Sequence, residues 1–132
     1  MAGSDQRRTL VLTGASRGIG HATVKRFSRE GWRVITCSRQ AFSENCPWPA
    51  GPEDHIKVDL ADPEDVGVAV SEIRHRLEAN GGQLTALVNN AGIMSYALIE
   101  DMSVELWDEM MAVNLRSMFL CSRCVISDMK AK

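Results

Sequence analysis

The sequence predicts an α/β fold in which helices cover both faces of a parallel β-sheet. Short apolar runs alternate four times with stretches of helical periodicity, an order typical of βαβ units. The first run, residues 9–13, contains only apolar and β-branched side chains, as expected of a strand buried on both faces. Because parallel strands are connected by right-handed crossovers, these units predict a doubly wound sheet between two helical layers.

Four strands are expected, at residues 9–13, 32–38, 55–59 and 86–89. A helix over residues 19–30 separates the first two, with Gly31 ending it. It is expected to place four side chains near one face: Ile19, Thr23, Phe27 and Glu30. Residues 40–54 carry three prolines and predict a loop.

The next helix has clear start and stop signals. Asp62 is predicted to cap it, Pro63 to occupy its first turn and Asp65 to take the capping-box position, while residues 80–82 (Asn-Gly-Gly) end it. Ser103 is expected to start a further helix. After Asn114, a long helix is predicted to place seven side chains on one face: Leu115, Met118, Phe119, Ser122, Val125, Ile126 and Met129.

Length and composition limit the classes of function. The 132 residues suit one domain, and 15 basic against 17 acidic side chains give a net charge of -2, which argues against broad binding of nucleic acid or anionic lipid. No apolar run approaches the ~20 residues of a membrane span, and the N-terminus lacks a signal-peptide pattern. A cytoplasmic protein with reduced cysteines is expected.

A glycine-rich loop lies between the first strand and the first helix, at residues 13–20 (Thr-Gly-Ala-Ser-Arg-Gly-Ile-Gly). A phosphate there would meet free backbone N–H groups and the positive end of the helix dipole. Gly14 is expected to make a tight turn at positive φ, Gly18 to let the backbone approach the ligand, and Gly20 to let the helix pack closely on the strand.

Three motifs in order carry a resemblance to a known family. They are the Thr-Gly-x-x-x-Gly-x-Gly spacing of residues 13–20, Asn-Asn-Ala-Gly at residues 89–92, and Asn114. Together they resemble the short-chain dehydrogenase/reductase (SDR) family. The resemblance implies hydride exchange between a nicotinamide cofactor and a carbonyl or alcohol. It also implies a flexible N-terminus at residues 1–8 and a partial Rossmann fold at residues 9–132, with sheet order 3-2-1-4.

The cofactor is expected to be NADP(H) in preference to NAD(H). In a Rossmann unit an acid at the end of the second strand contacts the adenosine ribose and repels a 2′-phosphate, whereas this strand ends Cys37-Ser38-Arg39. A guanidinium group suits phosphate because it presents a planar fork of donors. Arg17 in the glycine loop is expected to approach the same phosphate, although either arginine alone could be a solvated surface residue.

The resemblance extends the cofactor site to further residues. It implies that Asp59, left free because Asp62 caps the helix, binds the adenine amino group, with Leu60 against the ring. Asn89 would tie strand ends together beneath the cofactor, and Asn90 could be a plain turn residue. The full set of expected cofactor contacts is Gly14, Ser16, Arg17, Gly18, Ile19, Gly20, Ser38, Arg39, Asp59, Leu60, Asn89, Ala91 and Gly92.

The catalytic set implied by the resemblance is a serine, a tyrosine and a lysine four residues after that tyrosine, with Asn114 supporting a proton relay. The one tyrosine, Tyr96, is followed four residues later by Glu100, and the chain ends at Lys132 before the family's catalytic residues are expected. By resemblance this is a truncated, catalytically incompetent half, which would act on a small-molecule substrate only with the missing half.

Other functions remain open at this point. A non-catalytic NADP(H)-binding or partner-binding module and an unstable product without function are the alternatives. The isolated chain is expected to form homo-oligomers or to aggregate, because its fourth strand would be an apolar open edge. No metal site is expected, because Cys121-x-x-Cys124 lies inside a predicted helix and no second pair completes four ligands.

Overall fold

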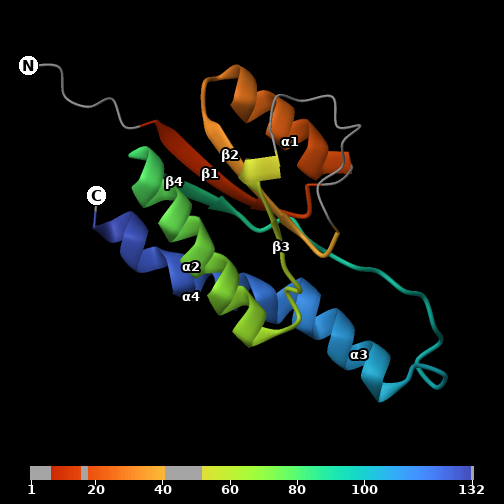
Figure 1. Cartoon of the computed structure of the whole chain (residues 1–132). Coiled ribbons are helices and arrows are strands. Elements are labelled where there is room, and N and C mark those ends of the chain that lie inside the picture. The colour runs from red at the N-terminus through yellow and green to blue at the C-terminus, as the bar shows by residue number, and fades with distance from the viewer. Residues whose placement is uncertain (1–6, 16–17, 41–51, 132) are drawn as a thin grey trace, which may run out of the picture.

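The computed structural model describes residues 7–15, 18–40 and 52–131. Within these residues, one parallel sheet runs through the molecule between helices (Figure 1). Its strands are β1 (Arg8–Thr13), β2 (Arg33–Ser38), β3 (His55–Lys57) and β4 (Gln83–Val88). The helices are α1 (Gly18–Arg29), α2 (Pro63–Asn80), α3 (Val104–Met111) and α4 (Ser117–Lys130), with a 3₁₀ turn η1 (Pro52–Asp54) and a π-helical turn η2 (Ala112–Arg116).

The strand order across the sheet is β3-β2-β1-β4, with every neighbouring pair parallel. The predicted order 3-2-1-4 is therefore confirmed. The chain builds outward from β1 through β2 to β3, and then returns to the other side of β1 to form β4. The order of the strands thus reverses between β1 and β4, and ligands of doubly wound sheets bind beside such a switch point, at the carboxyl ends of the strands.

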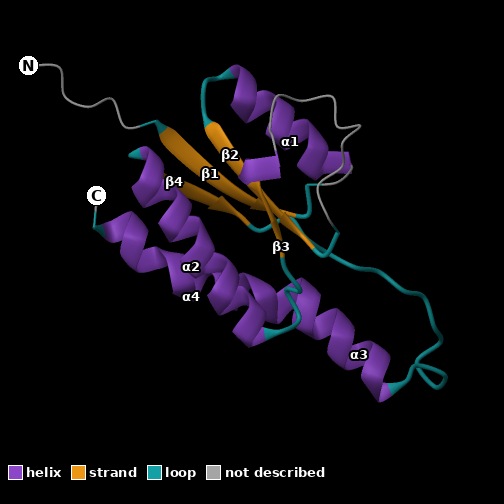
Figure 2. Ribbon diagram, in the orientation of Figure 1, coloured by secondary structure: helices purple, strands orange, loops and turns teal. Residues whose placement is uncertain are grey.

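Alternate side chains of β1 enter two separate cores. Leu10 and Leu12 pack with Val24 of α1 on one face, whereas Val11 belongs to the cluster that contains Ile73 of α2 and Val125 of α4. Figure 2 shows α1 on one side of the sheet and α2 with α4 on the other. This arrangement confirms the three-layer αβα prediction and the burial of the first strand on both faces.

The sheet begins one residue earlier than predicted. Arg8, expected in the flexible N-terminal segment, belongs to β1. Arg7 donates from Nε to the Gly31 carbonyl at 3.1 Å and from Nη2 to the Trp32 carbonyl at 3.3 Å, so it is fastened to the turn before β2. Residues 1–6 lie outside the described part of the chain.

Helix α2 starts and stops mostly as predicted. The Asp62 side chain accepts a hydrogen bond from Glu64 N at 3.0 Å, Pro63 opens the helix, and Gly81 closes it in the left-handed conformation with φ of 66°. The capping-box role predicted for Asp65 is wrong. Its Oδ2 accepts from Asp59 N at 2.6 Å, because the turn before the helix folds the Asp59 amide back over the first helical turn.

The buried face of the first helix is not the one predicted to carry Ile19, Thr23, Phe27 and Glu30. Gly20 and Val24 are the buried positions of α1, whereas Ile19 is 78% exposed. Phe27 is partly buried and packs against the same core as Val24. The reason is local, since the backbone at Gly20 must lie against the glycine loop, and this contact sets the rotation of the helix.

The predicted face of the last helix is also wrong in part. The buried side chains of α4 are Ser117, Leu120, Cys121 and Val125, whereas Phe119 is 58% and Ile126 49% exposed. The π-helical turn η2 precedes this helix and accommodates an extra residue, so that a stripe counted from Leu115 does not continue onto the buried face. An apolar face of α4 therefore points to solvent.

An ion pair fastens α2 to α4 on their side of the sheet. Arg74 Nε lies 3.0 Å from both carboxylate oxygens of Asp128, and Arg74 Nη2 donates to the Cys124 carbonyl at 2.6 Å. Such a forked contact fixes the relative position of the two helices better than a single point charge would. Among the helices that the structure describes, none has both the length and the apolar composition of a membrane span.

Candidate functional site

A cavity of about 320 Å³ opens at the carboxyl ends of the strands, beside the switch point between β1 and β4. Loops that follow β1, β2 and β4 bound it, together with Leu60 after β3 and Val113 of η2. The predicted contacts that line the cavity are Gly14, Ser38, Arg39, Leu60, Ala91 and Gly92. The fold thus brings predicted residues from four separate segments around one space.

The glycine loop reaches this site with backbone that only glycine adopts easily. Gly14 has φ of 74° and Gly18 has φ of 61°, both in the left-handed region, so the positive φ predicted for Gly14 is confirmed. A Cβ on Gly14 would lie 2.7 Å from Ala91 Cα, so the loops after β1 and β4 touch through their backbones. Apart from its neighbours in the chain and its own helix backbone, no described residue comes within 4 Å of a Cβ placed on Gly18, so the start of α1 has room for a ligand on this side.

Gly20 provides the close packing predicted for it. A Cβ at this position would meet the Gly14 carbonyl oxygen and would lie 2.7 Å from Asn90 Nδ2 and 2.9 Å from Ala15 Cα. Two of these three neighbours are backbone atoms that cannot rotate away. The first turn of α1 is therefore in contact with both the glycine loop and the loop after β4.

Thr13 and Asn90 fasten the ends of β1 and β4 to one another. Thr13 Oγ1 accepts from the backbone N–H groups of Asn90 and Ala91, both at 3.1 Å. The Asn90 side chain donates from Nδ2 to the Gly14 carbonyl at 2.9 Å. These bonds hold the two loops at the distance that Gly14 and Gly20 permit.

The strand-tying role predicted for Asn89 belongs to Asn90. Asn89 Nδ2 instead donates to Ser122 Oγ of α4 at 3.4 Å. Side chains alternate along a strand, and Leu87 packs toward α2 and α4 while Val88 packs toward α1. Continued past the end of β4, this alternation turns Asn89 toward α4 and Asn90 toward the glycine loop, a signal that the sequence already contained.

The end of β2 forms a small turn that His55 supports. Ser38 Oγ donates to the Gln40 carbonyl at 3.0 Å and accepts from Gln40 N at 3.3 Å. His55 Nε2 lies 2.8 Å from the same Gln40 carbonyl, and its Nδ1 lies 2.7 Å from Thr36 Oγ1. His55 thereby connects the buried middle of β2 to the turn that lines the cavity, a role that sequence analysis missed.

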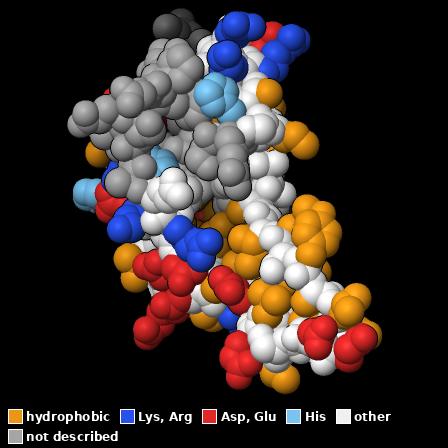
Figure 3. Space-filling view, turned by 90° about the vertical axis from the view of Figure 1, so that its right-hand side faces the viewer, with side chains coloured by type: hydrophobic (Ala, Val, Ile, Leu, Met, Phe, Trp, Pro, Cys, Tyr) orange, Lys and Arg blue, Asp and Glu red, His pale blue; other side chains and the backbone are white. Residues whose placement is uncertain are grey.

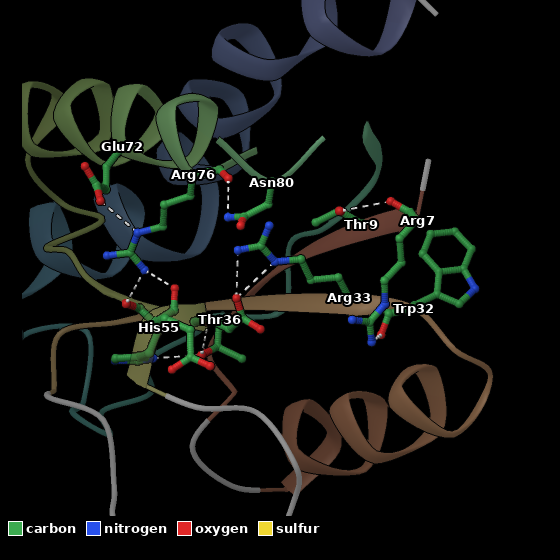
Figure 4. A network of polar contacts seen from close by, with 11 residues as sticks. Arg7, Thr9, Trp32, Arg33, Thr36, His55, Glu72, Arg76 and Asn80 are labelled. Carbon is green, nitrogen blue, oxygen red and sulfur yellow. Dashed lines mark hydrogen bonds and ion pairs between the residues drawn. The ribbon is translucent and has the colours of Figure 1, made fainter. Parts of the chain in front are cut away.

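Charged side chains fix η1 and the short strand β3 against β2 and α2 (Figure 4). Arg33 pairs with Asp54 at 3.0 Å, and both side chains are largely buried. Arg76 donates to the carbonyls of Glu53 and His55, the latter at 3.1 Å. Its hydrogen bond to Glu72 at 2.7 Å lowers the pKa of that exposed carboxyl group. β3 has only three residues, so these contacts secure the edge of the sheet beside the site.

Arg39, the residue expected to contact a 2′-phosphate, has a partner in the structure. Its Nη1 lies 3.7 Å from Glu109 Oε1 of α3, and the two side chains are 58% and 49% exposed. The sequence has no acid at the end of β2. In the folded chain, Glu109 of α3, 70 residues after Arg39, places a carboxylate beside it.

Asp59 and Leu60, in the loop after β3, differ in their exposure to solvent. Asp59 is not free, because its Oδ1 accepts from Ala61 N at 3.0 Å in a local turn. Its side chain is exposed and does not line the cavity, whereas Leu60 is 6% exposed and does. Arg116 of η2 donates to the Ala61 carbonyl at 2.7 Å and ties this loop to the helical layer.

Asn114 lies in η2 and clamps the loop that follows β4. Its Oδ1 accepts from Ile93 N at 2.7 Å, and its Nδ2 donates to the Ile93 carbonyl at 2.8 Å. A second, more open hollow beside this cavity is lined by Asn114 together with residues 91–94. π-helical turns in proteins often occur at functional positions, and this one orients Asn114, the predicted relay residue, toward the loop that follows β4.

Some predicted site residues are not brought into the cavity. Ser16 and Arg17 lie outside the described residues. Ile19 is exposed at the start of α1, and Asn89 faces α4. Tyr96 is 87% exposed on the extended segment before α3, so it does not face the cavity at the strand ends.

Cys37 and Cys121, the buried cysteines near the site, have low reactivity. Burial, followed by the neighbouring Cys121 thiol, raises the pKa of Cys37 to about 12. Burial and Cys124 raise the pKa of Cys121 to about 11. Both thiols stay protonated near neutral pH, which makes them poor nucleophiles and poor metal ligands. Among the described residues, no three His, Cys, Asp or Glu side chains are grouped to hold a metal ion.

The donor set fits a dinucleotide. Gly18 leaves an open backbone at the N-terminus of a twelve-residue helix whose first turn carries no acidic side chain, which suits a pyrophosphate. The cavity between the β2 turn and Leu60 offers apolar contact, a hydroxyl group and a guanidinium group, which suit an adenosine ribose bearing a phosphate. The fold and this site define a dinucleotide-binding unit of the Rossmann type.

Comparison with known proteins places the chain in one family. Residues 8–132 match the model of the family described as short chain dehydrogenase, and the chain belongs to that family. Protein FixR of Bradyrhizobium diazoefficiens is 42% identical over 131 residues, an alignment that covers 94% of this chain and 46% of that protein. The chain spans about half the length of most of the curated relatives with which it aligns.

Solved structures resemble the chain equally clearly. An oxidoreductase of the short chain dehydrogenase/reductase family from Brucella ovis, in complex with a partially ordered NAD, is 61% identical with a TM-score of 0.88, covering 96% of this chain and 59% of that one. A metagenomic short-chain oxidoreductase in complex with NADP is 28% identical with a TM-score of 0.79, covering 96% of this chain and 57% of that one.

Substitution of Gly20 should damage the site, whereas an equivalent change elsewhere should not. We expect Gly20→Ala to lower the free energy of unfolding by about 1–3 kcal/mol or more, since overpacking against backbone cannot relax. Gly67→Ala in α2 is the matched control, because no described residue outside the local helix backbone comes within 4 Å of its Cβ, and it should raise stability by about 0.5–1 kcal/mol. Urea unfolding measures both, and equal effects of the two changes would contradict the packing role of Gly20.

Proposed function

We propose that this chain is the cofactor-binding unit of an NADP(H)-dependent short-chain dehydrogenase/reductase, which exchanges a hydride with a carbonyl or alcohol substrate. The observation that carries the proposal is the cavity at the strand ends, which Gly14 of the glycine loop lines together with Ser38 and Arg39. Relatives solved with NAD and with NADP support a nicotinamide dinucleotide as ligand. Buried free thiols at Cys37 and Cys121 suit the reducing cytoplasm, where we propose that the protein acts.

Each part of the dinucleotide would have its own protein partners. Gly18, Ile19 and the start of α1 would bind the pyrophosphate with Ser16, while Arg17, Ser38 and Arg39 would bind the 2′-phosphate. Leu60 and Asp59 would contact the adenine, and Ala91 and Gly92 the nicotinamide ribose. When bound, the nicotinamide supplies or accepts the hydride. Asn114, held by Ile93, would position the relay side of the site for the catalytic residues of the complete enzyme.

The first prediction concerns cofactor choice. NADPH should bind about tenfold or more tightly than NADH, because a charge-assisted hydrogen bond to the 2′-phosphate is worth roughly 1.5–3 kcal/mol. Arg39→Asp should erase or invert this preference. Arg29→Asp, an equal charge reversal at the far end of α1, is the control and should leave it unchanged. Equal affinities of the unmodified chain for the two cofactors, measured by calorimetry, would contradict the NADP(H) assignment.

The second prediction concerns turnover. With NADPH bound, the 132-residue chain should consume it only at the background rate with ketones, quinones and acyl thioesters. General acid–base catalysis is typically worth about 10²–10⁴ in rate, and Tyr96 is exposed and followed by Glu100 where the family has a lysine. Tyr96→Phe should therefore change nothing. A rate well above background that disappears in Tyr96→Phe would locate the catalytic centre at Tyr96 instead.

The exposure of Tyr96 also favours a second candidate function, a non-catalytic NADP(H)-binding or partner-binding module. The coding sequence after Lys132 separates the two functions. An in-frame Tyr-x-x-x-Lys favours the enzyme, whereas a stop codon at that point favours the module. Binding of NADPH without turnover by the natural product would support the module as well.

The third prediction concerns self-association. β4 pairs only with β1 among the described strands, and the apolar side chains Leu115 of η2 and Phe119 and Ile126 of α4 are exposed. Figure 3 shows further hydrophobic side chains gathered on the side where α3 and the preceding segment lie. Contiguous apolar surface and an open sheet edge both favour association.

Light scattering at tens of micromolar should therefore find species larger than the 14.6 kDa monomer. The double change Phe119→Gln and Ile126→Gln should reduce their size. Val68→Gln, at a position 67% exposed on α2, is the control and should not. A uniform monomer for the unmodified chain would contradict the proposal.

A further inference from the structure

Glu109 brings a carboxylate to the part of the site where the sequence shows none. The strand that meets the adenosine ribose ends in Cys37, Ser38 and Arg39, without an acid. In the folded chain, Glu109 Oε1 lies 3.7 Å from Arg39 Nη1. The guanidinium group expected to bind the 2′-phosphate therefore already has an anionic partner.

The position of Glu109 on its helix explains how it reaches the site. Glu109 lies one helical turn before Val113, which lines the cavity from the helical layer. Arg39 lines the same cavity from the turn after β2. The ion pair thus connects α3 to Arg39, a residue that lines the cavity.

We propose that Glu109 competes with the 2′-phosphate of the cofactor for Arg39, and so reduces the preference for NADP(H) that Arg39 alone would provide. The inference rests on the proposed function, because it takes the adenosine end of the cofactor to lie between β2 and Leu60. It adds a residue that sets cofactor selectivity and that no position in the glycine loop or at the end of β2 reveals.

The competition follows from the charges. A guanidinium group binds a phosphate best through its planar fork of donors, and Arg39 loses part of that fork while it contacts Glu109. The carboxylate also repels the incoming dianion. NADH carries no 2′-phosphate, so it does not compete with Glu109 for Arg39. Its affinity should therefore stay the same when the ion pair between Arg39 and Glu109 is removed. Because both side chains are about half exposed, solvent screens the pair and the effect is modest.

The test measures the affinities of the full chain for NADPH and NADH, by fluorescence of the bound nicotinamide. Glu109→Gln should tighten NADPH binding by about 1.5- to 5-fold, the range of exposed ion pairs, and leave NADH binding unchanged. Glu105→Gln is the matched control, since it removes the same charge from the first turn of the same helix and should alter neither affinity. Far-ultraviolet circular dichroism verifies that each variant is folded.

A second background shows whether Glu109 acts through Arg39. In an Arg39→Met chain, Glu109→Gln should have no effect on NADPH affinity, because the group for which it competes is gone. An equal gain in both backgrounds would show a general charge effect and would overturn the competition. Unchanged NADPH affinity in Glu109→Gln alone would overturn it as well.

Failure of the proposed function gives a different result. If Arg39→Met does not weaken NADPH binding, the assignment of Arg39 to the 2′-phosphate is wrong and the inference about Glu109 fails with it. If Arg39→Met weakens NADPH binding while Glu109→Gln leaves it unchanged, the proposed function stands and only the competition is overturned. Binding of neither cofactor would overturn both.

Discussion

The site depends on the contact between two backbones, that of the loop after β1 and that of the loop after β4. A Cβ at Gly14 would lie 2.7 Å from Ala91 Cα, and a Cβ at Gly20 would collide with the Gly14 carbonyl. Only residues without a Cβ allow the two backbones to come this close, and the hydrogen bonds of Thr13 and Asn90 then hold the two loops together. β4 is thereby placed beside β1 with its end against the glycine loop, and the cavity exists because the strands end together at this point.

The opposite wall of the cavity depends on a different kind of interaction. β3 has only three residues and could not fix the edge of the sheet by backbone pairing alone. The largely buried pair of Arg33 and Asp54, and the contact of His55 with Thr36, hold it to β2. His55 then supports the turn at Gln40, whereas the side chain of Arg39, which precedes Gln40 in this turn, remains exposed. The buried contacts give the wall its shape, while the exposed guanidinium group is free to exchange partners.

The sequence predicted what depends on local pattern. Three layers, the positive φ of Gly14 and the caps of α2 follow from short motifs and from the right-handed crossover, whereas the strand order 3-2-1-4 is implied by the family resemblance. The predictions that fail concern rotation and distant partners. The prediction that Asn89 ties the strand ends fails because the side-chain alternation of β4 continues past the strand and turns Asn90 toward the glycine loop, and the predicted stripe of α4 is displaced because a π-helical turn has no reliable signature in sequence. The pairing of Arg39 with Glu109 joins residues 70 positions apart and required coordinates.

The π-helical turn η2 also explains why one helical segment can serve both the site and the core. Before the turn, Glu109 reaches Arg39, and within it Val113 lines the cavity while Asn114 pairs with Ile93. After it, Leu120, Cys121 and Val125 enter the core against the sheet. An unbroken α-helix keeps one face toward one neighbour, so a segment that must contact the strand ends and then the sheet needs a change of phase between them. Under the proposed function, the charge around the adenosine ribose therefore depends on Glu109 of this segment as well as on the residues that end β2.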